Sequence, residues 1–198
     1  MAPRRAAVLR DDDRSLREHL IATAERMIAA TGATGLTVRA IARAAGVADG
    51  VLYNHFADKE ELLAAALRAH VDTVRSGMDP LPAAGTGDLA ANLRAYLDHG
   101  LALHRAILPA FTGLLGQPAV LARFADGDQG GDWRAELAAY LAAERDLGRL
   151  APTADVDTAV ALASGVCHEV VLSTMFPHAA SPRVPTEAVV TAILHGIA

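Results

Sequence analysis

Apolar residues recur every three or four positions through most of the chain, which is the spacing of an amphipathic helix. The first such repeat runs over residues 15–31. Ser15 and Glu18 have the spacing of a capping box, so we expect the first helix to begin at Ser15. The pattern therefore predicts a helical amino-terminal region.

Two short helical repeats follow, separated by one turn. Thr37 can cap the first of them, and Gly46 supplies the left-handed residue that ends it. The second covers residues 49–56, where Leu52 and Phe56 fall four apart on one face. A helix, a tight turn with glycine and a second helix make the helix-turn-helix geometry of many DNA-binding proteins, although an ordinary helical hairpin shares this spacing.

Helical repeats continue to the end of the chain, with turn signals between them. We expect helices at residues 59–77, from residue 88 onward, and at 133–148, 155–175 and 186–197. Pro109 is expected to kink or break the helix that follows the one starting at residue 88. Gly and Pro predict a loop at 79–87, a turn at 116–118, a mobile loop at 125–131 and a Pro-rich turn at 177–185. The fold class that follows is all-α.

Composition agrees with helices and bears on the compartment. Hydrophobic residues make up 52% of the chain but aromatic residues only 4%, which favours Ala- and Leu-rich helices over a β-sheet. Cys167 is the only cysteine, so an internal disulfide is excluded and a cytoplasmic location is expected. The longest apolar run, residues 159–176, contains His168 and Glu169 near its middle, which argues against a membrane segment.

Charge is distributed unevenly along the chain. The net charge is −5, which taken alone argues against a nucleic-acid partner. Residues 1–60, however, hold nine Lys and Arg against eight Asp and Glu, whereas residues 61–198 hold nine against fifteen. The acidic excess therefore lies outside the amino-terminal part, which also carries a basic arm made of Arg4, Arg5, Arg10 and Arg14.

The amino-terminal helices carry a family signature. Residues 20–67 read LIATAERMIAATGATGLTVRAIARAAGVADGVLYNHFADKEELLAAAL and closely resemble the DNA-binding domain of the Tet repressor (TetR) family of transcriptional regulators. The matches fall in fixed register at Thr37, Ile41-Ala42, Ala45-Gly46-Val47, Leu52-Tyr53, Phe56, Lys59-Glu60 and Leu62-Leu63. The resemblance implies an N-terminal three-helix helix-turn-helix domain followed by a helical ligand-binding and dimerisation domain.

The resemblance also suggests where the domains begin and end. We expect a basic and acidic arm at residues 1–13 and the DNA-binding domain at residues 14–74. The helical effector-binding and dimerisation domain is then expected at residues 75–198. No motif in that last part matches a family pattern.

DNA contacts are expected from the second, third and fourth helices. By resemblance, Tyr53 and Lys59 contact the phosphate backbone, and the start of the second helix adds Thr37 and Arg39. The third helix would lie in the major groove, where Gly50 allows close approach. The positions expected to face DNA there are Asp49, Gly50, Val51, Asn54 and His55.

Three positions depart from the common family pattern. Ala48, Asp49 and Val51 stand where many members have a hydroxyl or basic residue. Asp49 either caps the third helix or accepts a hydrogen bond from a cytosine amino group. Asn54 could read adenine, and Val51 a thymine methyl group. Because these positions lack hydroxyls, a helical small-molecule-binding protein with weak or lost DNA binding is an alternative to a repressor.

Partners are implied by the later helices and by the resemblance. The helices at 155–175 and 186–197 are more apolar than one core face needs, which suggests a partner. The resemblance implies that these helices pair in a homodimer, and such a two-fold dimer is expected to bind a palindromic double-stranded DNA operator. The resemblance implies that an unknown small-molecule effector releases the repressor. Candidate pocket residues are aromatic or polar positions of the middle helices and residues beside them: Tyr96, His99, Leu103, Phe111, Leu115, Trp133, Leu137 and His168.

Neither an enzyme site nor a metal or cofactor site is expected. Cys167, His168 and Glu169 are adjacent, and adjacent residues on a helix point about 100° apart, so they do not converge on one metal or form a nucleophile–base pair. Residues 126–137 imitate the start of a calcium-binding loop but lack an acidic residue at its twelfth position. A DNA-binding regulator is therefore the function that we expect.

Overall fold

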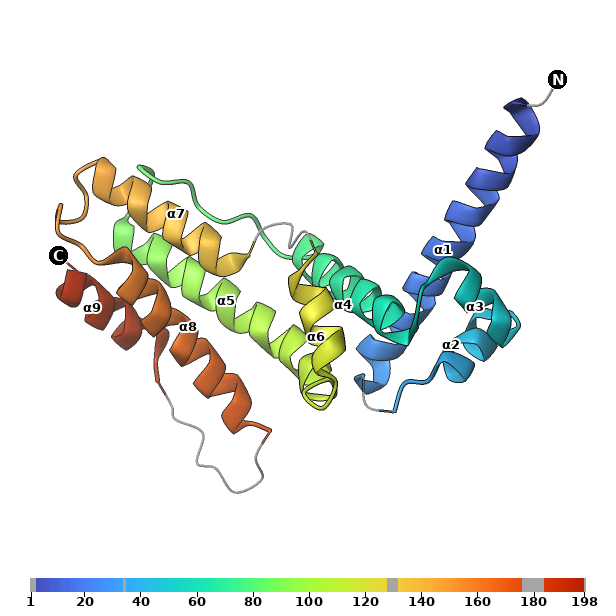
Figure 1. The fold of residues 1–198 in the computed structure, drawn as a ribbon. Helices are drawn as coiled ribbons and strands as arrows, with labels where there is room; N and C mark the ends of the chain where they lie inside the picture. Colours follow the sequence, from blue (N-terminus) through green and yellow to red (C-terminus); the bar gives the residue numbers. More distant parts are fainter. Residues whose placement is uncertain (1–2, 34, 128–131, 176–183, 198) are drawn as a thin grey trace. The chain divides into compact units, whose positions relative to one another are not determined.

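The chain is helical throughout its regular structure. The computed structural model describes residues 3–33, 35–127, 132–175 and 184–197, and every regular element among them is an α-helix (Figure 1). The helices are α1 Pro3–Thr31, α2 Val38–Ala45, α3 Asp49–His55, α4 Lys59–Ser76, α5 Leu89–Thr112, α6 Pro118–Ala125, α7 Trp133–Asp146, α8 Val156–Ser173 and α9 Thr186–Ile197. The predicted all-α fold class is confirmed.

The helices form two compact units. The first contains Met1–Ser76 together with Pro109–Gln129, so that α6 belongs with α1 to α4. The second contains Gly77–Leu108 together with Gly130–Ala198. Parts of the mobile loop and of the Pro-rich turn predicted from the sequence, residues 128–131 and 176–183, lie outside the described residues.

Two helix boundaries differ from the prediction. Helix α1 already begins at Pro3, so Ser15 and Glu18 lie inside it and the predicted capping box is wrong. A cap satisfies the free N–H groups of a first turn, and the preceding helical turns leave none at Ser15. Helix α5 continues past Pro109 to Thr112, so the predicted break does not occur.

Helix α6 was not predicted, although the sequence contains a signal for it. Pro118 occupies the first turn, where its missing N–H costs nothing and its fixed φ angle favours a helix. Gly116 and Gln117, which were predicted as a turn, lie immediately before it, and Gln117 is the residue that precedes the helix at its amino end.

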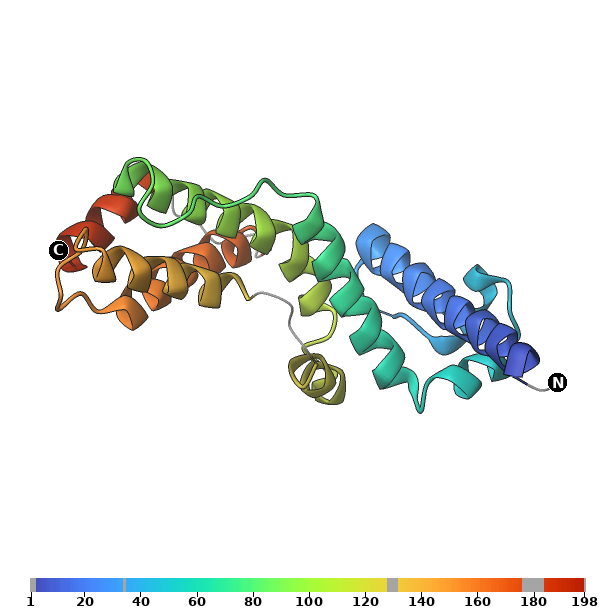
Figure 2. The same ribbon diagram turned by 90° about the horizontal axis from the view of Figure 1, so that it is seen from above.

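The core of the first unit lies between α1, α4 and α6. Helices α1 and α4 run side by side (Figure 2), and α6 packs against α4. Leu20 and Ile28 of α1 meet Leu63 and Leu67 of α4 in one buried cluster, to which α6 adds Val120. Helices α2 and α3 also pack on α1, and they add Ile41 and Leu52 to the same cluster.

The second unit is built from α5, α7, α8 and α9. Helix α7 packs on α8 and α8 on α9, and α5 lies beside them (Figures 1 and 2). Gly100 in the middle of α5 makes room for the indole of Trp133, because a Cβ atom there would lie 2.4 Å from the ring. The Trp133 Nε1–H donates a hydrogen bond to the carbonyl of Tyr96, at 3.0 Å, which fixes α7 against α5.

Helix α8 is long and apolar. Among the described residues it is the one helix that by length and hydropathy could cross a membrane, with a mean hydropathy of 1.3 over 18 residues. Core helices of soluble proteins meet the same criterion. In this fold Ala159, Ala163 and Cys167 are fully buried, while Leu162 is 54% exposed. Leu162 and Leu172 are thus large apolar side chains of α8 that the described part of the chain leaves exposed.

The first unit offers a matched test of its core. Leu63→Ala should lower the free energy of unfolding by about 2–5 kcal/mol, because Leu63 is fully buried and its truncation leaves a cavity. Leu115→Ala, at a side chain that is 70% exposed, should change it by less than about 0.5 kcal/mol. Urea unfolding followed by circular dichroism measures both. Equal losses in the two variants would contradict this core.

Candidate nucleic-acid interface

Helix α2 is capped and anchored as the sequence predicts. The Thr37 hydroxyl accepts a hydrogen bond from the backbone N–H of Ala40 at 3.1 Å, which satisfies a donor of the first turn. Ile41 and Ala42 are fully buried in the core of the first unit. The opposite side of α2, which carries Arg39 and Arg43, is exposed.

The turn between α2 and α3 depends on Gly46. Its φ angle is +74°, in the left-handed region that side chains with a Cβ disfavour. In this conformation the Gly46 N–H donates to the carbonyl of Arg43 at 3.3 Å, and the Val47 N–H donates to that of Ala42 at 3.0 Å. These two bonds close the end of α2 and turn the chain directly into α3.

Helix α3 is short and is held by its apolar side. It has seven residues, of which Leu52 is 2% exposed, and Phe56 immediately after it is 3% exposed. Ala48 occupies the capping position and makes no side-chain bond, while Asp49 is already the first helical residue. The prediction that Asp49 caps the helix is therefore wrong, because the carboxylate turns outward to Arg39 instead.

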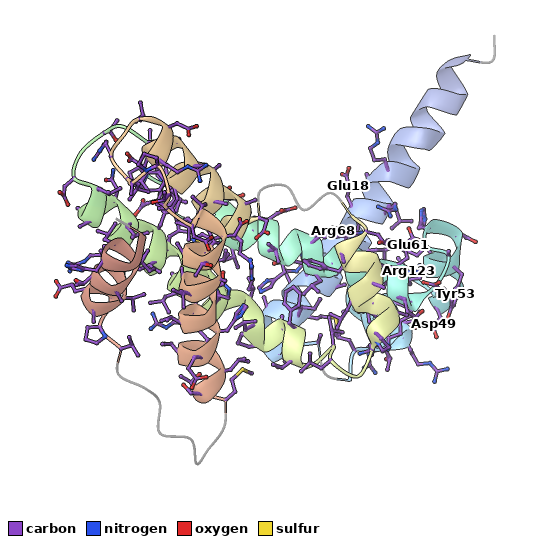
Figure 3. All side chains as sticks on the ribbon, turned by 60° about the vertical axis from the view of Figure 1, so that its left-hand side comes forward. Glu18, Asp49, Tyr53, Glu61, Arg68 and Arg123 are labelled. Carbon is purple, nitrogen blue, oxygen red and sulfur yellow. The ribbon has the colours of Figure 1, made fainter. Side chains whose placement is uncertain are left out.

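The outer surface of α2 and α3 is open and polar. Asp49 and Tyr53 lie on this surface (Figure 3), with Tyr53 61% exposed and Asn54 also exposed. Val51 and His55 are half-buried, and a Cβ added at Gly50 would meet nothing within 4 Å. A shallow hollow is lined by Thr37, Val38, Arg39, Asp49 and Tyr53. The surface can therefore be approached closely by a large partner.

The junction between α3 and α4 is held by charged groups. Asp58 accepts a bond from the Glu61 N–H at 2.8 Å, and Glu61 accepts one from the Ala57 N–H at 2.7 Å, an arrangement close to that of a capping box. Arg17 of α1 donates to Glu61 at 3.0 Å. The Arg123 guanidinium of α6 donates hydrogen bonds to both carboxylate oxygens of Asp58, at 2.8 and 2.6 Å.

Lys59 starts α4 at this junction. It is half-buried, and its Nζ donates to the Gln117 side chain at 3.4 Å. Arg68, further along α4, donates to the backbone carbonyl of Arg123 at 2.8 Å. Arg17 and Arg123 were not singled out from the sequence, because their partners lie 44 and 65 residues away and leave no local pattern.

Aromatic and imidazole rings meet inside the second unit. The His104 ring lies edge-on to Trp133 and to His168, with centroids 5.5 and 4.8 Å apart, and Tyr96 stacks on Tyr140 at 4.5 Å. Burial lowers the pKa of His104, and the neighbouring His168 lowers it further, against the hydrogen bond to the Gly100 carbonyl. His104 is therefore a neutral ring at neutral pH.

The predicted effector residues fall into two groups. Tyr96, His99, Leu103, Trp133, Leu137 and His168 belong to the second unit, where Leu103 and Leu137 are buried and His99 and His168 half-buried. Phe111 and Leu115 belong to the first unit. Phe111 packs edge-on against Phe124 of α6, with centroids 5.0 Å apart, and Leu115 is 70% exposed.

A buried polar cluster in the second unit was missed by sequence reasoning. Glu144 is fully buried and accepts a bond from the Gly85 N–H at 3.2 Å, while its second oxygen lies 3.3 Å from Nε of Arg149. The pKa of Tyr140 is raised, mainly because its hydroxyl is buried and secondly because it is hydrogen-bonded to Glu144. The sequence spacing of Glu144 within an Ala-rich helix gave no signal of burial.

The adjacent Cys167, His168 and Glu169 do not form a reactive group. Cys167 is fully buried, and burial raises the pKa of its thiol to about 12, so the thiolate is scarce at neutral pH. Glu169 on the same helix is exposed. Among the described residues, no three His, Cys, Asp or Glu side chains are placed to hold a metal ion.

Comparison with known proteins places this surface in a family. The family model described as bacterial regulatory proteins, tetR family, matches residues 20–66, which contain α2, the Gly46 turn and α3. This segment carries the likeness to the TetR family, and it is the part of the chain that the family model covers. The repressor KstR2 of Mycobacterium tuberculosis is 45% identical to it over 58 residues, which make up 29% of each chain. The chain thus aligns with under a third of the length of that repressor.

Solved structures extend the likeness beyond the amino-terminal helices. The multidrug-binding protein EbrR, complexed with ethidium, is 25% identical with a TM-score of 0.60, and the match covers 92% of this chain and 99% of that one. A putative TetR-family regulator from Mesorhizobium loti has a TM-score of 0.61 at 19% identity, covering 93% and 98%. The TetR-like fold therefore includes the helical carboxy-terminal part.

The two glycines of the interface should respond differently to the same substitution. Gly46→Ala should lower the free energy of unfolding by about 1–2 kcal/mol, because its φ angle is left-handed. Gly50→Ala should leave it unchanged or raise it by up to about 1 kcal/mol, because Gly50 is helical and has open space around it. Thermal unfolding of both variants tests this difference. A comparable loss in each would show that Gly50, too, is required by the fold.

Proposed function

We propose that the chain is a cytoplasmic, homodimeric transcriptional repressor that binds a palindromic DNA operator and is released by a small-molecule effector. One observation supports this most: α3 buries Leu52 beneath it and presents Asp49, Tyr53 and Asn54 outward. A short helix with this division fits the major groove, which is wide enough to admit an α-helix. The likeness to the TetR family agrees with it.

The proposed DNA contacts divide into those that position the protein and those that read bases. Thr37, Arg39, Tyr53 and Lys59 would contact phosphates, and Gly50 would let the backbone approach one closely. Asp49, Val51, Asn54 and His55 would face base edges. Since α4 begins at Lys59, the backbone N–H groups of its first residues would add a site for a phosphate.

The two-fold partner is proposed to be a second copy of the chain. Helices α8 and α9, at residues 155–175 and 186–197 of the sequence prediction, would pair with their counterparts in a four-helix bundle. Leu162, Leu172 and Val184 are exposed large apolar residues on or beside these helices, at 54, 36 and 41%. Dimerisation would bury them and place two copies of α3 about one turn of DNA apart, roughly 34 Å.

The effector is proposed to bind in the second unit. The rings of Tyr96, Trp133, His104 and His168 gather there and combine apolar faces with polar atoms, as ligand sites do. The structure of EbrR holds ethidium, which is a planar cation. An aromatic molecule is accordingly the class of effector that we would test first. Release would require that it bind more tightly to a conformation that does not fit the operator.

Domain roles follow from these proposals. Residues 14–74 would form the DNA-binding domain, residues 75–198 the effector-binding and dimerisation domain, and residues 1–13 an arm. Residues 3–13 continue α1 as a helix. Helix α6, which packs on α4 and grips Asp58 through Arg123, would act on the DNA-binding helices although it belongs to the later part of the sequence.

Salt dependence tests the DNA-binding function. The full chain should bind a duplex that it selects from a random library, with an affinity that falls steeply as salt rises. Lys59→Ala should weaken binding to all duplexes alike and reduce the slope of log K against log salt by about 1, whereas Lys59→Arg should keep the slope. Arg105→Ala removes an exposed charge from the second unit and serves as the control.

Two outcomes would contradict this proposal. Absence of any selected duplex, even in dilute buffer, would favour a helical small-molecule-binding protein without DNA affinity. An equal loss of slope in Arg105→Ala and Lys59→Ala would mean that the DNA contact does not involve the start of α4. Fluorescence anisotropy at several salt concentrations distinguishes these cases.

A further inference from the structure

One ion pair lies on the open surface of the helix-turn-helix. Arg39 of α2 and Asp49 of α3 approach through Nε and Oδ2 at 3.3 Å, and their side chains are 86% and 50% exposed. Both line the shallow hollow on that surface. The pair therefore combines hydrogen-bond donors and an acceptor where DNA is proposed to bind.

We propose that the Asp49 carboxylate, held by Arg39, accepts a hydrogen bond from a cytosine amino group at one position of each operator half-site. The inference rests on the proposed DNA-binding function and adds to it the base that is read. Asp49 is the first residue of α3, and the amino-terminal end of a recognition helix is the part that reaches base edges.

The Asp49 carboxylate can accept further hydrogen bonds besides the one from Arg39. An ionised Asp is an acceptor only, with two oxygens and about four lone-pair sites. Arg39 occupies one position on Oδ2. Within the described ranges, no other side-chain bond reaches Asp49, so Oδ1 is open to a partner.

Cytosine is the base that suits a carboxylate in the major groove. It presents its N4 amino group as a donor, whereas guanine presents only acceptors and thymine an acceptor and a methyl group. Adenine also has an amino donor, but its N7 acceptor lies beside that donor. A carboxylate that bonds to the adenine amino group meets this second acceptor without a proton to offer it, so cytosine is preferred.

Arg39 reduces the electrostatic repulsion between the Asp49 carboxylate and the DNA phosphates. An unpaired negative charge among phosphates is repelled, and the guanidinium offsets that charge while fixing one carboxylate oxygen. Its other N–H groups stay available for a phosphate. Arg39 is therefore a positioning residue for Asp49 as well as a proposed backbone contact.

The test is a base-by-base comparison of variants. The full-length protein is used to select duplexes from a random library, and each position of the selected site is then replaced by all four base pairs. The wild-type protein should prefer cytosine over the other bases at one position per half-site by about 5- to 100-fold. Asp49→Ala should lose the preference there and keep it at all other positions.

Asp49→Asn gives the sharpest expected result. Asparagine pairs with adenine through its N6 and N7 atoms, so the preference at that one position should change from cytosine to adenine. Arg39→Ala should weaken the cytosine preference, and Arg39→Lys should restore part of it. Asp72→Asn makes the same change of charge at an exposed residue of α4 and should alter no preference.

The results separate this inference from the function beneath it. If the wild-type protein selects no duplex, both are overturned. If it selects duplexes but Asp49→Ala and Asp49→Asn keep the wild-type base ranking at every position, the reading role is overturned and the DNA-binding function stands. A uniform gain in affinity for all duplexes in both variants would likewise overturn it, because Asp49 would then only repel phosphates.

Discussion

Burial of Leu52 and Phe56 is the interaction on which the DNA-facing surface depends. Isolated helices shorter than about 12–15 residues are marginal in water, and α3 has only seven. It exists because these two side chains complete the core formed by α1, α4 and α6. Everything that α3 presents outward is therefore positioned by a core that includes residues nearly a hundred positions apart in the sequence, such as Leu20 and Leu114.

Charged groups then fix the direction in which α3 leaves that core. Arg17 from α1 and Arg123 from α6 bind Glu61 and Asp58, and Asp58 is the carboxylate that caps the first turn of α4. Exposed single ion pairs contribute little to stability, but a two-bond guanidinium–carboxylate contact also fixes geometry. The core provides the stability of the junction, and these arginines define its angle. A change in the position of α6 would thus alter the position of α3, the helix that is proposed to enter DNA.

Several local signals in the sequence predict the structure correctly, whereas the long-range contacts leave no local signal. The Thr37 cap, the left-handed Gly46 and the buried pair Leu52 and Phe56 follow from neighbouring residues, and all agree with the structure. The start of α1 was misjudged because the Ser15 signal is valid only where a helix begins. The Arg123–Asp58 contact and the buried Glu144 depend on residues brought together by folding, so no spacing rule could find them. The DNA and effector residues stay predictions.

Hydrogen exchange of the full chain, with and without a selected duplex, tests the account most directly. If the outer surface of α2 and α3 faces DNA, the duplex should slow exchange of backbone N–H groups at residues 37–39 and 49–59. The core of α4 should be protected in both states, since Leu62 to Leu67 are buried already. Tight binding of the duplex with protection confined to other segments would contradict the account.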